Sequence, residues 1–182
     1  MLDAFDEVLA QARTGAGEAF TLLYRDLVRP VAAYVRSQGV GEVEDVTSEV
    51  FLAAFTGLEG FAGDQAGFRS WVFTIAHRRV MDHWRKAARA VPQVAYDTAD
   101  DDRTVPSAEV GALDVLGSQR VVELLASLTD EQREVLALRV VADLTVEQVA
   151  AVVGRSEGAV KALQRRALAT LRRQMEREAA PL

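Results

Sequence analysis

Residues 144–173, "LTVEQVAAVVGRSEGAVKALQRRALATLRR", have the pattern of two helices joined by a tight turn. Thr145 and Gln148 form a capping box, and Ser156 can cap the second helix. Gly154 lies between the two helices and permits the sharp reversal that such a pair needs. The stretch therefore predicts a helix-turn-helix unit. Upstream, Thr129 and Gln132 form another capping box, which predicts the start of an earlier helix.

The second helix of this unit divides into an apolar side and a cationic side on an ideal wheel. The apolar side contains Val160, Leu163, Gln164, Ala167, Leu168 and Leu171. The cationic side contains Lys161, Ala162, Arg165, Arg166, Ala169, Arg172 and Arg173. In helix-turn-helix proteins the second helix enters the major groove of DNA, where arginine and lysine pair with guanine edges. We therefore predict DNA binding, with a solvated basic helix in a plain three-helix bundle as the alternative.

A second cationic segment lies at residues 68–89, "FRSWVFTIAHRRVMDHWRKAAR", which has six bases and one acid in a chain of net charge −6. If residues 70–89 form one helix, its later cations fall within a sector of about 120°. These are Arg78, Arg79, Arg85, Lys86 and Arg89. A glycine-rich loop with Phe61 and Phe68 precedes this helix. Cationic tracks with exposed rings bind single-stranded nucleic acid, although Trp71, Phe73 and Trp84 also fit a protein core.

An acidic helix is predicted before that loop, in "GVGEVEDVTSEVFLAAF", residues 39–55. Its buried side consists of Val43, Val46, Val50, Phe51, Ala53 and Ala54. Its exposed side consists of Glu42, Asp45, Ser48, Glu49, Leu52 and Thr56. An acidic face with one exposed leucine suits a partner helix of opposite charge, but it also fits an ordinary protein surface.

The whole chain reads as all-α, with two small helical domains, residues 1–90 and 118–182, joined by a flexible linker, residues 91–117. The helical period fails in that linker, where Pro92, Pro106 and the acids Asp100 to Asp102 occur. Its 27 residues could span up to ~90 Å. There are no cysteines. No run reaches the roughly 18 apolar residues of a membrane helix, and the acidic N-terminus is unlike a secretory signal, so we expect a cytoplasmic protein.

These motifs, in this order from about Phe20 to Arg173, resemble bacterial sigma factors of the extracytoplasmic-function (ECF) group of the sigma-70 family. The resemblance implies a helical bundle, sigma region 2, followed by a helix-turn-helix domain, sigma region 4. It implies a transcription initiation factor, with core RNA polymerase and promoter DNA as partners. An anti-sigma factor would regulate it, and no cofactor, metal or membrane insertion is expected.

The resemblance also implies roles for particular residues. Core polymerase would contact Asp45, Ser48, Glu49 and Leu52. The −10 element would contact Phe61, Gly63, Asp64, Gln65, Phe68, Arg78, Arg85 and Lys86. The −35 element would contact Lys161, Ala162, Arg165, Arg166, Arg172 and Arg173. Many relatives carry a small polar residue at the position of Arg78, so the base that Arg78 would meet is left open.

Three other classes of protein fit less of the sequence. An enzyme could use His77 and His83 with Asp82, but the histidines are six residues apart and lack the i, i+4 spacing of a helical metal pair. A two-component regulator would share the helix-turn-helix, but the first 90 residues lack the alternating strands and helices of a receiver domain. A helical adaptor would explain the acidic helix and leave both cationic faces unexplained.

Overall fold

The computed structural model describes residues 4–90 and 124–179. Every regular element in these two ranges is a helix, so the prediction of an all-α fold is confirmed for them. The expected linker, residues 91–117, and residues 118–123 lie outside the described residues. The linker and the domain boundaries therefore stay predictions.

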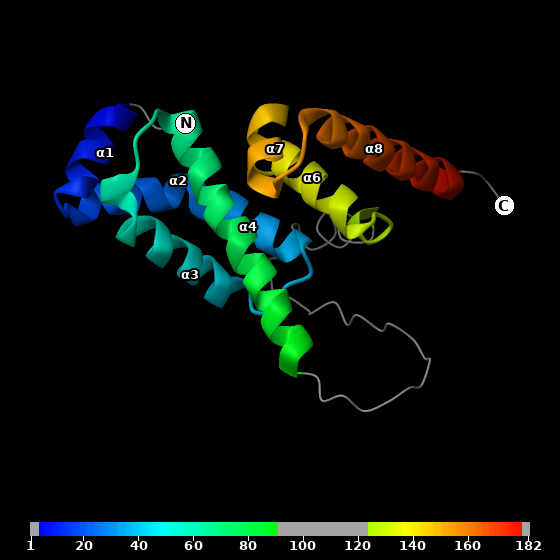
Figure 1. Cartoon of the computed structure of the whole chain (residues 1–182), viewed down its shortest axis with the longest axis horizontal. Coiled ribbons are helices and arrows are strands. Elements are labelled where there is room, and N and C mark those ends of the chain that lie inside the picture. The colour runs from blue at the N-terminus through cyan, green and yellow to red at the C-terminus, as the bar shows by residue number, and fades with distance from the viewer. Residues whose placement is uncertain (1–3, 91–123, 180–182) are drawn as a thin grey trace.

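The first helical unit is a bundle whose two longest helices are α2 and α4 (Figure 1). Its elements are α1 Phe5–Arg13, α2 Gly17–Ser37, α3 Val43–Thr56, the 3-10 turn η1 Leu58–Gly60 and α4 Gln65–Ala90. Helix α4 is longer than the expected 70–89, because Asp64 caps its first turn by accepting a hydrogen bond from the Gly67 amide at 2.8 Å. Helix α3 packs between α2 and α4.

The apolar periodicity places the core of this unit as the sequence predicts. Val43, Val46 and Val50 of α3 are buried, and its acidic residues face water. In α4 the apolar residues that face the core are fully buried, namely Val72, Phe73, Ala76 and Val80. The cations on the other side are exposed, namely Arg78, Arg85, Lys86 and Arg89. The i, i+4, i+8 spacing of the buried residues accounts for this division, since it repeats on one side of a helix.

The second unit contains α6 Asp130–Val140, α7 Val146–Val153 and α8 Glu157–Ala179. Thr145 and Gln148 form the predicted capping box of α7 in full. The Thr129 side chain accepts from the Gln132 amide at 3.4 Å, and Ser156 accepts from the Ala159 amide at 3.2 Å. Gly154 adopts the left-handed conformation, with φ 66° and ψ 35°, and turns the chain from α7 into α8. The predicted helix-turn-helix is confirmed.

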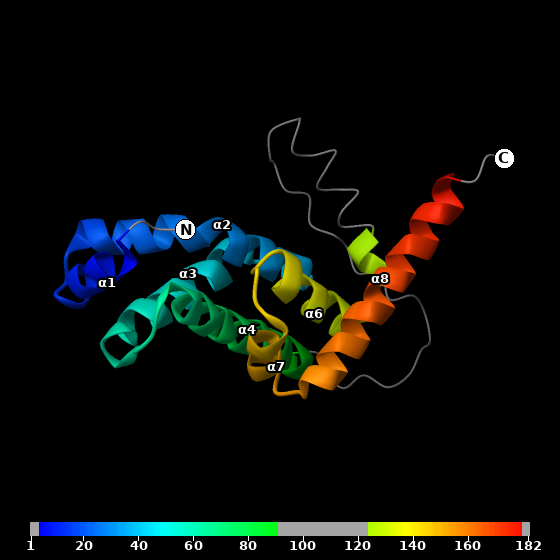
Figure 2. The same ribbon diagram turned by 90° about the horizontal axis from the view of Figure 1, so that it is seen from above.

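The two units pack against each other, which the sequence interpretation did not anticipate. Helix α6 lies on α2, and α7 lies on α4 (Figures 1 and 2). Apolar residues of both units belong to one buried cluster, which includes Val31 and Phe73 of the first unit and Leu138 and Val149 of the second. In α6 the four consecutive residues 135–138 are all buried. Four consecutive residues sweep about 300° of a helix, so α6 is covered on nearly every side.

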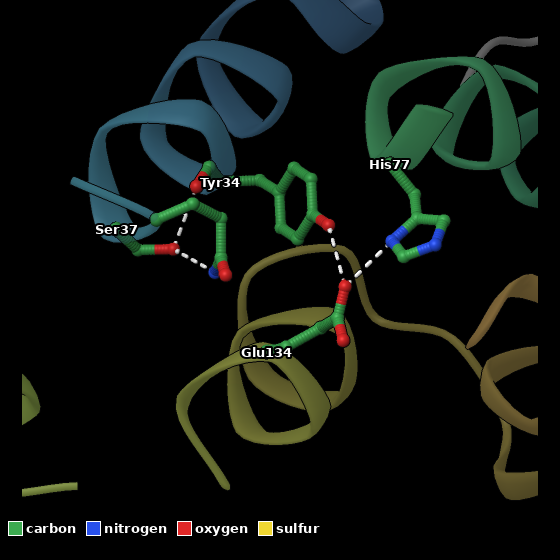
Figure 3. Close-up of polar contacts among 5 residues, drawn as sticks. Tyr34, Ser37, His77 and Glu134 are labelled. Carbon is green, nitrogen blue, oxygen red and sulfur yellow. Dashed lines mark hydrogen bonds and ion pairs between the residues drawn. The ribbon is translucent and has the colours of Figure 1, made fainter. Parts of the chain in front are cut away.

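A polar contact lies inside this apolar interface (Figure 3). Glu134 of α6 points between α2 and α4, where its Oε1 accepts a hydrogen bond from the Tyr34 hydroxyl at 3.4 Å. Nδ1 of His77 lies 2.5 Å from the same oxygen. Burial, with the nearby Glu134 charge as a smaller cause, raises the pKa of Tyr34 well above 10.0.

We predict opposite effects on stability for the same change at two glycines. Gly154→Ala should lower the free energy of unfolding by about 1 kcal/mol, because alanine is strained at positive φ although open space surrounds the site. Gly158→Ala, in the first turn of α8, should raise it by about 0.5 kcal/mol through helix propensity. Urea denaturation followed by circular dichroism measures both. Equal effects at the two sites would contradict the assignment of the turn.

We also predict that stability declines above about pH 10, since only the unfolded chain ionises Tyr34 readily. Below that pH the phenol is neutral in both states, and its contribution is fully present. As the pH rises past the ordinary value of 10.0, ionisation stabilises the unfolded state, and the contribution is lost toward the raised folded pKa. Denaturation midpoints measured from pH 8 to 11 should fall more for the natural protein than for Tyr34→Phe. Parallel curves would contradict the buried neutral phenol.

Candidate nucleic-acid interface

Helix α8 presents its cationic side to water as the wheel predicts. Lys161, Arg165, Arg166, Arg172 and Arg173 are all exposed, and Ala162 between them is partly exposed. Their contacts are local and weak. The Lys161 ammonium lies 3.2 Å from Glu157, and the Arg166 Nε donates to the Ala162 carbonyl at 3.3 Å. Exposed contacts of this kind contribute little to stability, so these side chains are free to pair with a ligand.

The opposite, apolar side of α8 is only partly buried. Val160 and Ala167 are 0% exposed and Leu163 is 5% exposed, which matches the wheel. Leu168, however, is 50% exposed. The apolar side that the wheel predicts is therefore only partly buried among the described residues.

The cationic face of α4 is also open to solvent, and two of its arginines lie close to acidic side chains. Arg85 is paired with Asp82 at 2.5 Å, one turn away on the same helix. Arg79 lies 3.9 Å from Glu49 of α3, so the cationic and acidic faces of the first unit meet along α3 and α4. Arg78 and Lys86 are exposed, and no ion pair with them is found among the described residues. Arg89, further along α4, is likewise exposed, and no ion pair with it is found in the described part of the chain.

The loop before α4 differs from the sequence interpretation. Phe61 and Phe68 were expected to offer exposed rings, but they are 8% and 3% exposed. Their rings pack on each other and on Trp71, with centroids 5.2 to 5.8 Å apart. The prediction of exposed rings is wrong because this aromatic cluster completes the core of the unit. The role of the loop in DNA binding stays a prediction.

The surface of this loop is formed instead by Ala62, Gly63 and Asp64, which are exposed, and by the partly exposed Gln65. A Cβ at Gly63 would lie 3.1 Å from the Phe61 ring, so glycine lets the backbone fold closely over that ring. The Arg13 guanidinium donates to the Phe61 carbonyl from α1. The loop is thus supported from below by aromatic rings and tied to α1, which holds its exposed backbone in place.

A hollow of about 390 Å³ lies between α3 and α4, beside the cationic face. Its walls are formed by Ala53, Trp71, Ile75, Arg78, Arg79 and Asp82. The combination of one indole, two guanidinium groups and one carboxylate provides a stacking surface and both donors and an acceptor. Trp71, which the sequence left between core and surface, is partly exposed on this hollow.

The acidic face of α3 matches its prediction residue by residue. Asp45, Ser48 and Glu49 are exposed, and Leu52 is 70% exposed. The Ser48 hydroxyl donates to the Glu44 carbonyl at 2.8 Å, within the helix. A single large apolar side chain surrounded by acids remains uncovered, which is the arrangement that a cationic partner helix would bury.

Two negative findings limit the chemistry of the described residues. They contain no group of three or more His, Asp or Glu side chains that could hold a metal ion. No helix in the described part of the chain has the length and apolar composition that crossing a bilayer requires.

Comparison with known families divides the chain where the fold does. Residues 20–90 match Sigma-70 region 2, and residues 124–173 match Sigma-70, region 4. The chain is 35% identical over 184 aligned residues to the ECF RNA polymerase sigma factor SigD of Mycobacterium tuberculosis, covering 93% of this chain and 83% of SigD. It is 32% identical to the ECF RNA polymerase sigma factor BldN of Streptomyces coelicolor, covering 92% of this chain and 64% of BldN.

Among solved structures, the chain is similar to CnrH in complex with the cytosolic domain of CnrY. The TM-score is 0.70 at 29% identity, and the match covers 97% of this chain and 100% of that one. The fold and the faces described above define a two-part helical binding protein of the sigma-70 class. The chain belongs to the sigma-70 family, and within it to the ECF RNA polymerase sigma factors. The first unit is region 2, and the second is region 4.

Sequence reasoning did not identify the residues that join region 2 to region 4. Arg69 was counted only among the six bases of the segment at residues 68–89, and its guanidinium donates to the Ala142 carbonyl, just after α6, at 3.2 Å. Tyr34, His77 and Glu134 were assigned no common role. The sequence feature that could have revealed this docking is the run of four apolar residues at 135–138. Such a run covers more of the helix circumference than a single buried side does.

Proposed function

We propose that the chain acts as a promoter-specific initiation factor, binding core RNA polymerase in the cytoplasm and directing it to DNA. The observation that carries this proposal is the presence of two exposed cationic faces, on α4 and α8, beside one exposed acidic face with an uncovered leucine, on α3. The chain spans 64% of BldN, so the full activity of that relative is carried over only as part of this proposal.

Helix α8 would read the −35 element as double-stranded DNA. Lys161, Arg165 and Arg166 lie toward its N-terminal half, the part that a helix-turn-helix places in the major groove. The small side chain of Ala162 lets the backbone approach the bases. Arg172 and Arg173 lie two turns further along, where they would hold phosphates and set the register without reading sequence.

Region 2 would hold the −10 element in a melted form. Arg85 and Lys86 would bind phosphates, and the exposed loop residues Gly63, Asp64 and Gln65 would contact an extruded base. The hollow beside Trp71 and Arg78 offers a second place for a ring to stack. Unstacking a base costs a few kcal/mol, and binding the extruded base offsets that cost, so melting needs no nucleotide hydrolysis. Phe61 and Phe68 would support the loop from within the core.

The acidic face of α3 would dock on core polymerase. Asp45, Ser48 and Glu49 would meet cationic and polar groups, and Leu52 would be buried in the contact. Burying an exposed leucine contributes about 1.5–3 kcal/mol, and the surrounding acids would steer the encounter. We also propose control by a separate anti-sigma factor, since the similar CnrH was solved with a partner protein, the cytosolic domain of CnrY.

Run-off transcription with purified core polymerase on a promoter library tests this function. The protein should produce transcripts from a defined subset of templates, which share one motif near −35 and another near −10. Transcripts no different from those of core polymerase alone would reject the proposal.

We predict that Arg166→Ala relaxes the preference at −35. Losing a good base contact reduces discrimination by about 1–3 kcal/mol, which is roughly 5- to 150-fold between matched and mismatched elements. Arg177→Ala is the matched control, because Arg177 is an exposed cation in the last turns of the same helix. Equal selectivity of the two variants on the library would contradict the assignment of α8.

We predict that Asp45→Ala combined with Glu49→Ala weakens binding to core polymerase at least about tenfold, because truncated charges at a docking surface lose steering and pairing. Asp6→Ala with Glu7→Ala changes the net charge equally on another exposed surface, in the first turn of α1, and should leave binding nearly unchanged. Fluorescence anisotropy of the labelled protein measures the affinity. A comparable loss in both double variants would indicate a general charge effect.

A further inference from the structure

Helix α1 lies outside the residues that match Sigma-70 region 2, yet it is built into the same unit. The match begins at residue 20, whereas α1 spans Phe5–Arg13. The helix packs against α2 and η1 (Figure 1). Its apolar side is buried in the core and consists of Phe5, Val8, Leu9 and Ala12. This packing fixes the position of its last turn, which carries Arg13.

Two contacts join α1 to the loop before α4, residues 61–64. The Phe5 ring packs on the Phe68 ring, with centroids 5.7 Å apart, and the Phe68 ring packs on that of Phe61. The Arg13 guanidinium donates to the Phe61 carbonyl. Among the described residues no backbone amide bonds to this oxygen. Because a backbone carbonyl needs a donor when water is partly excluded, Arg13 takes the place of a main-chain partner there.

The exposed backbone of the loop is held on both sides. On one side Arg13 bonds to the Phe61 carbonyl. On the other side the Asp64 carboxylate accepts from the Gly67 amide at 2.8 Å, in the first turn of α4. Only residues 62 and 63 lie between these two fixed points. The loop therefore contains a short stretch of main chain whose two ends are positioned by side chains.

That stretch offers a ligand mainly its peptide groups. Ala62 and Gly63 are both exposed, and neither has a polar side chain. Gly63 has φ of 156°, which favours glycine, and a Cβ there would lie 3.1 Å from the Phe61 ring. An extruded base is read by hydrogen bonds to its edge, and such bonds weaken steeply as their angles change. A main chain that reads a base must therefore be held still.

Arg13 is suited to hold it, because no acid competes for its guanidinium. The side chain is exposed, and no carboxylate pairs with it in the part of the chain that the structure describes. Its position in the last turn of α1 also places its charge at the negative end of the helix dipole. Lysine at this position would keep the charge and a donor, whereas methionine would keep a long side chain and lose both.

We propose that α1 is part of the −10 site and that Arg13 is a positioning residue, which sets the base preference of the loop by holding the Phe61 carbonyl. Arg13 acts through the main chain of residues 62–64 and not by contacting the base. The effect on base preference rests on the proposed function of the loop, whereas the tie between Arg13 and the loop concerns the free protein alone.

Hydrogen–deuterium exchange of the free, full-length protein tests the tie. The amides of Phe61, Gly67 and Phe68 are hydrogen-bonded at the two ends of the loop. We expect them to exchange faster in Arg13→Met, because local opening becomes easier, and at a rate nearer the natural one in Arg13→Lys. Arg36→Met is the matched control, because Arg36 is an exposed cation in the last turn of α2. Unchanged exchange in Arg13→Met would overturn the positioning role.

Run-off transcription on promoters that carry every base at each −10 position tests the consequence. We expect Arg13→Met to lose discrimination about tenfold at one or two adjacent −10 positions, which is what losing a hydrogen bond from a charged group typically costs. The −35 preference and the affinity for core polymerase should be unchanged, and Arg13→Lys should retain most of the −10 preference. A merely structural role would not confine the change to those positions.

Two results of the transcription assay would overturn the proposal. One is an unchanged −10 preference in Arg13→Met. The other is a uniform loss on all promoters, which would assign Arg13 to a phosphate contact. If the natural protein itself gives no promoter-specific transcripts, the proposed function fails, and the exchange experiment still decides whether Arg13 holds the loop.

Discussion

Burial of α6 on nearly all sides is the constraint on which the docking of region 2 on region 4 depends. Its Val135 and Leu138 belong to the cluster shared with region 2, whereas Leu136 packs with Ala167 of α8. Each fully buried side chain of this size contributes about 1.5–3 kcal/mol, so a few of them hold regions 2 and 4 together. Glu134 contacts Tyr34 of α2 and His77 of α4, which specifies one register.

Acidic and basic side chains lie on separate faces of the folded molecule. The chain is acidic overall, yet the cations of α4 and α8 form two exposed faces, and the acids of α3 form a third. The faces of α3 and α4 meet where Arg79 approaches Glu49 at 3.9 Å. Local fields decide which ligand approaches which face, so a net negative protein can present two surfaces for nucleic acid and one for a cationic partner.

The helices, their caps and their polarity could be predicted from the sequence, because these features depend on neighbours a few residues away. Thr145 with Gln148, the turn at Gly154 and the exposed Leu52 are examples. The docking of region 2 on region 4 could not be predicted, since it joins Tyr34 to Glu134 across 100 positions. Phe61 and Phe68 were misjudged for a related reason. An aromatic residue in a glycine-rich loop has no periodic pattern that tells whether its ring faces water or the core.

The central claim is that α4 and α8 contact two separate elements of one DNA when core polymerase is bound. DNA cleavage by an iron chelate tethered to a single introduced cysteine tests it most directly, with Ala169→Cys marking α8 and Ala88→Cys marking α4. Both positions are exposed, and the natural chain has no cysteine to interfere. The account predicts two cleavage centres roughly 15–20 base pairs apart on a promoter selected by the holoenzyme. Cleavage by both reagents at one place, or at random positions, would contradict it.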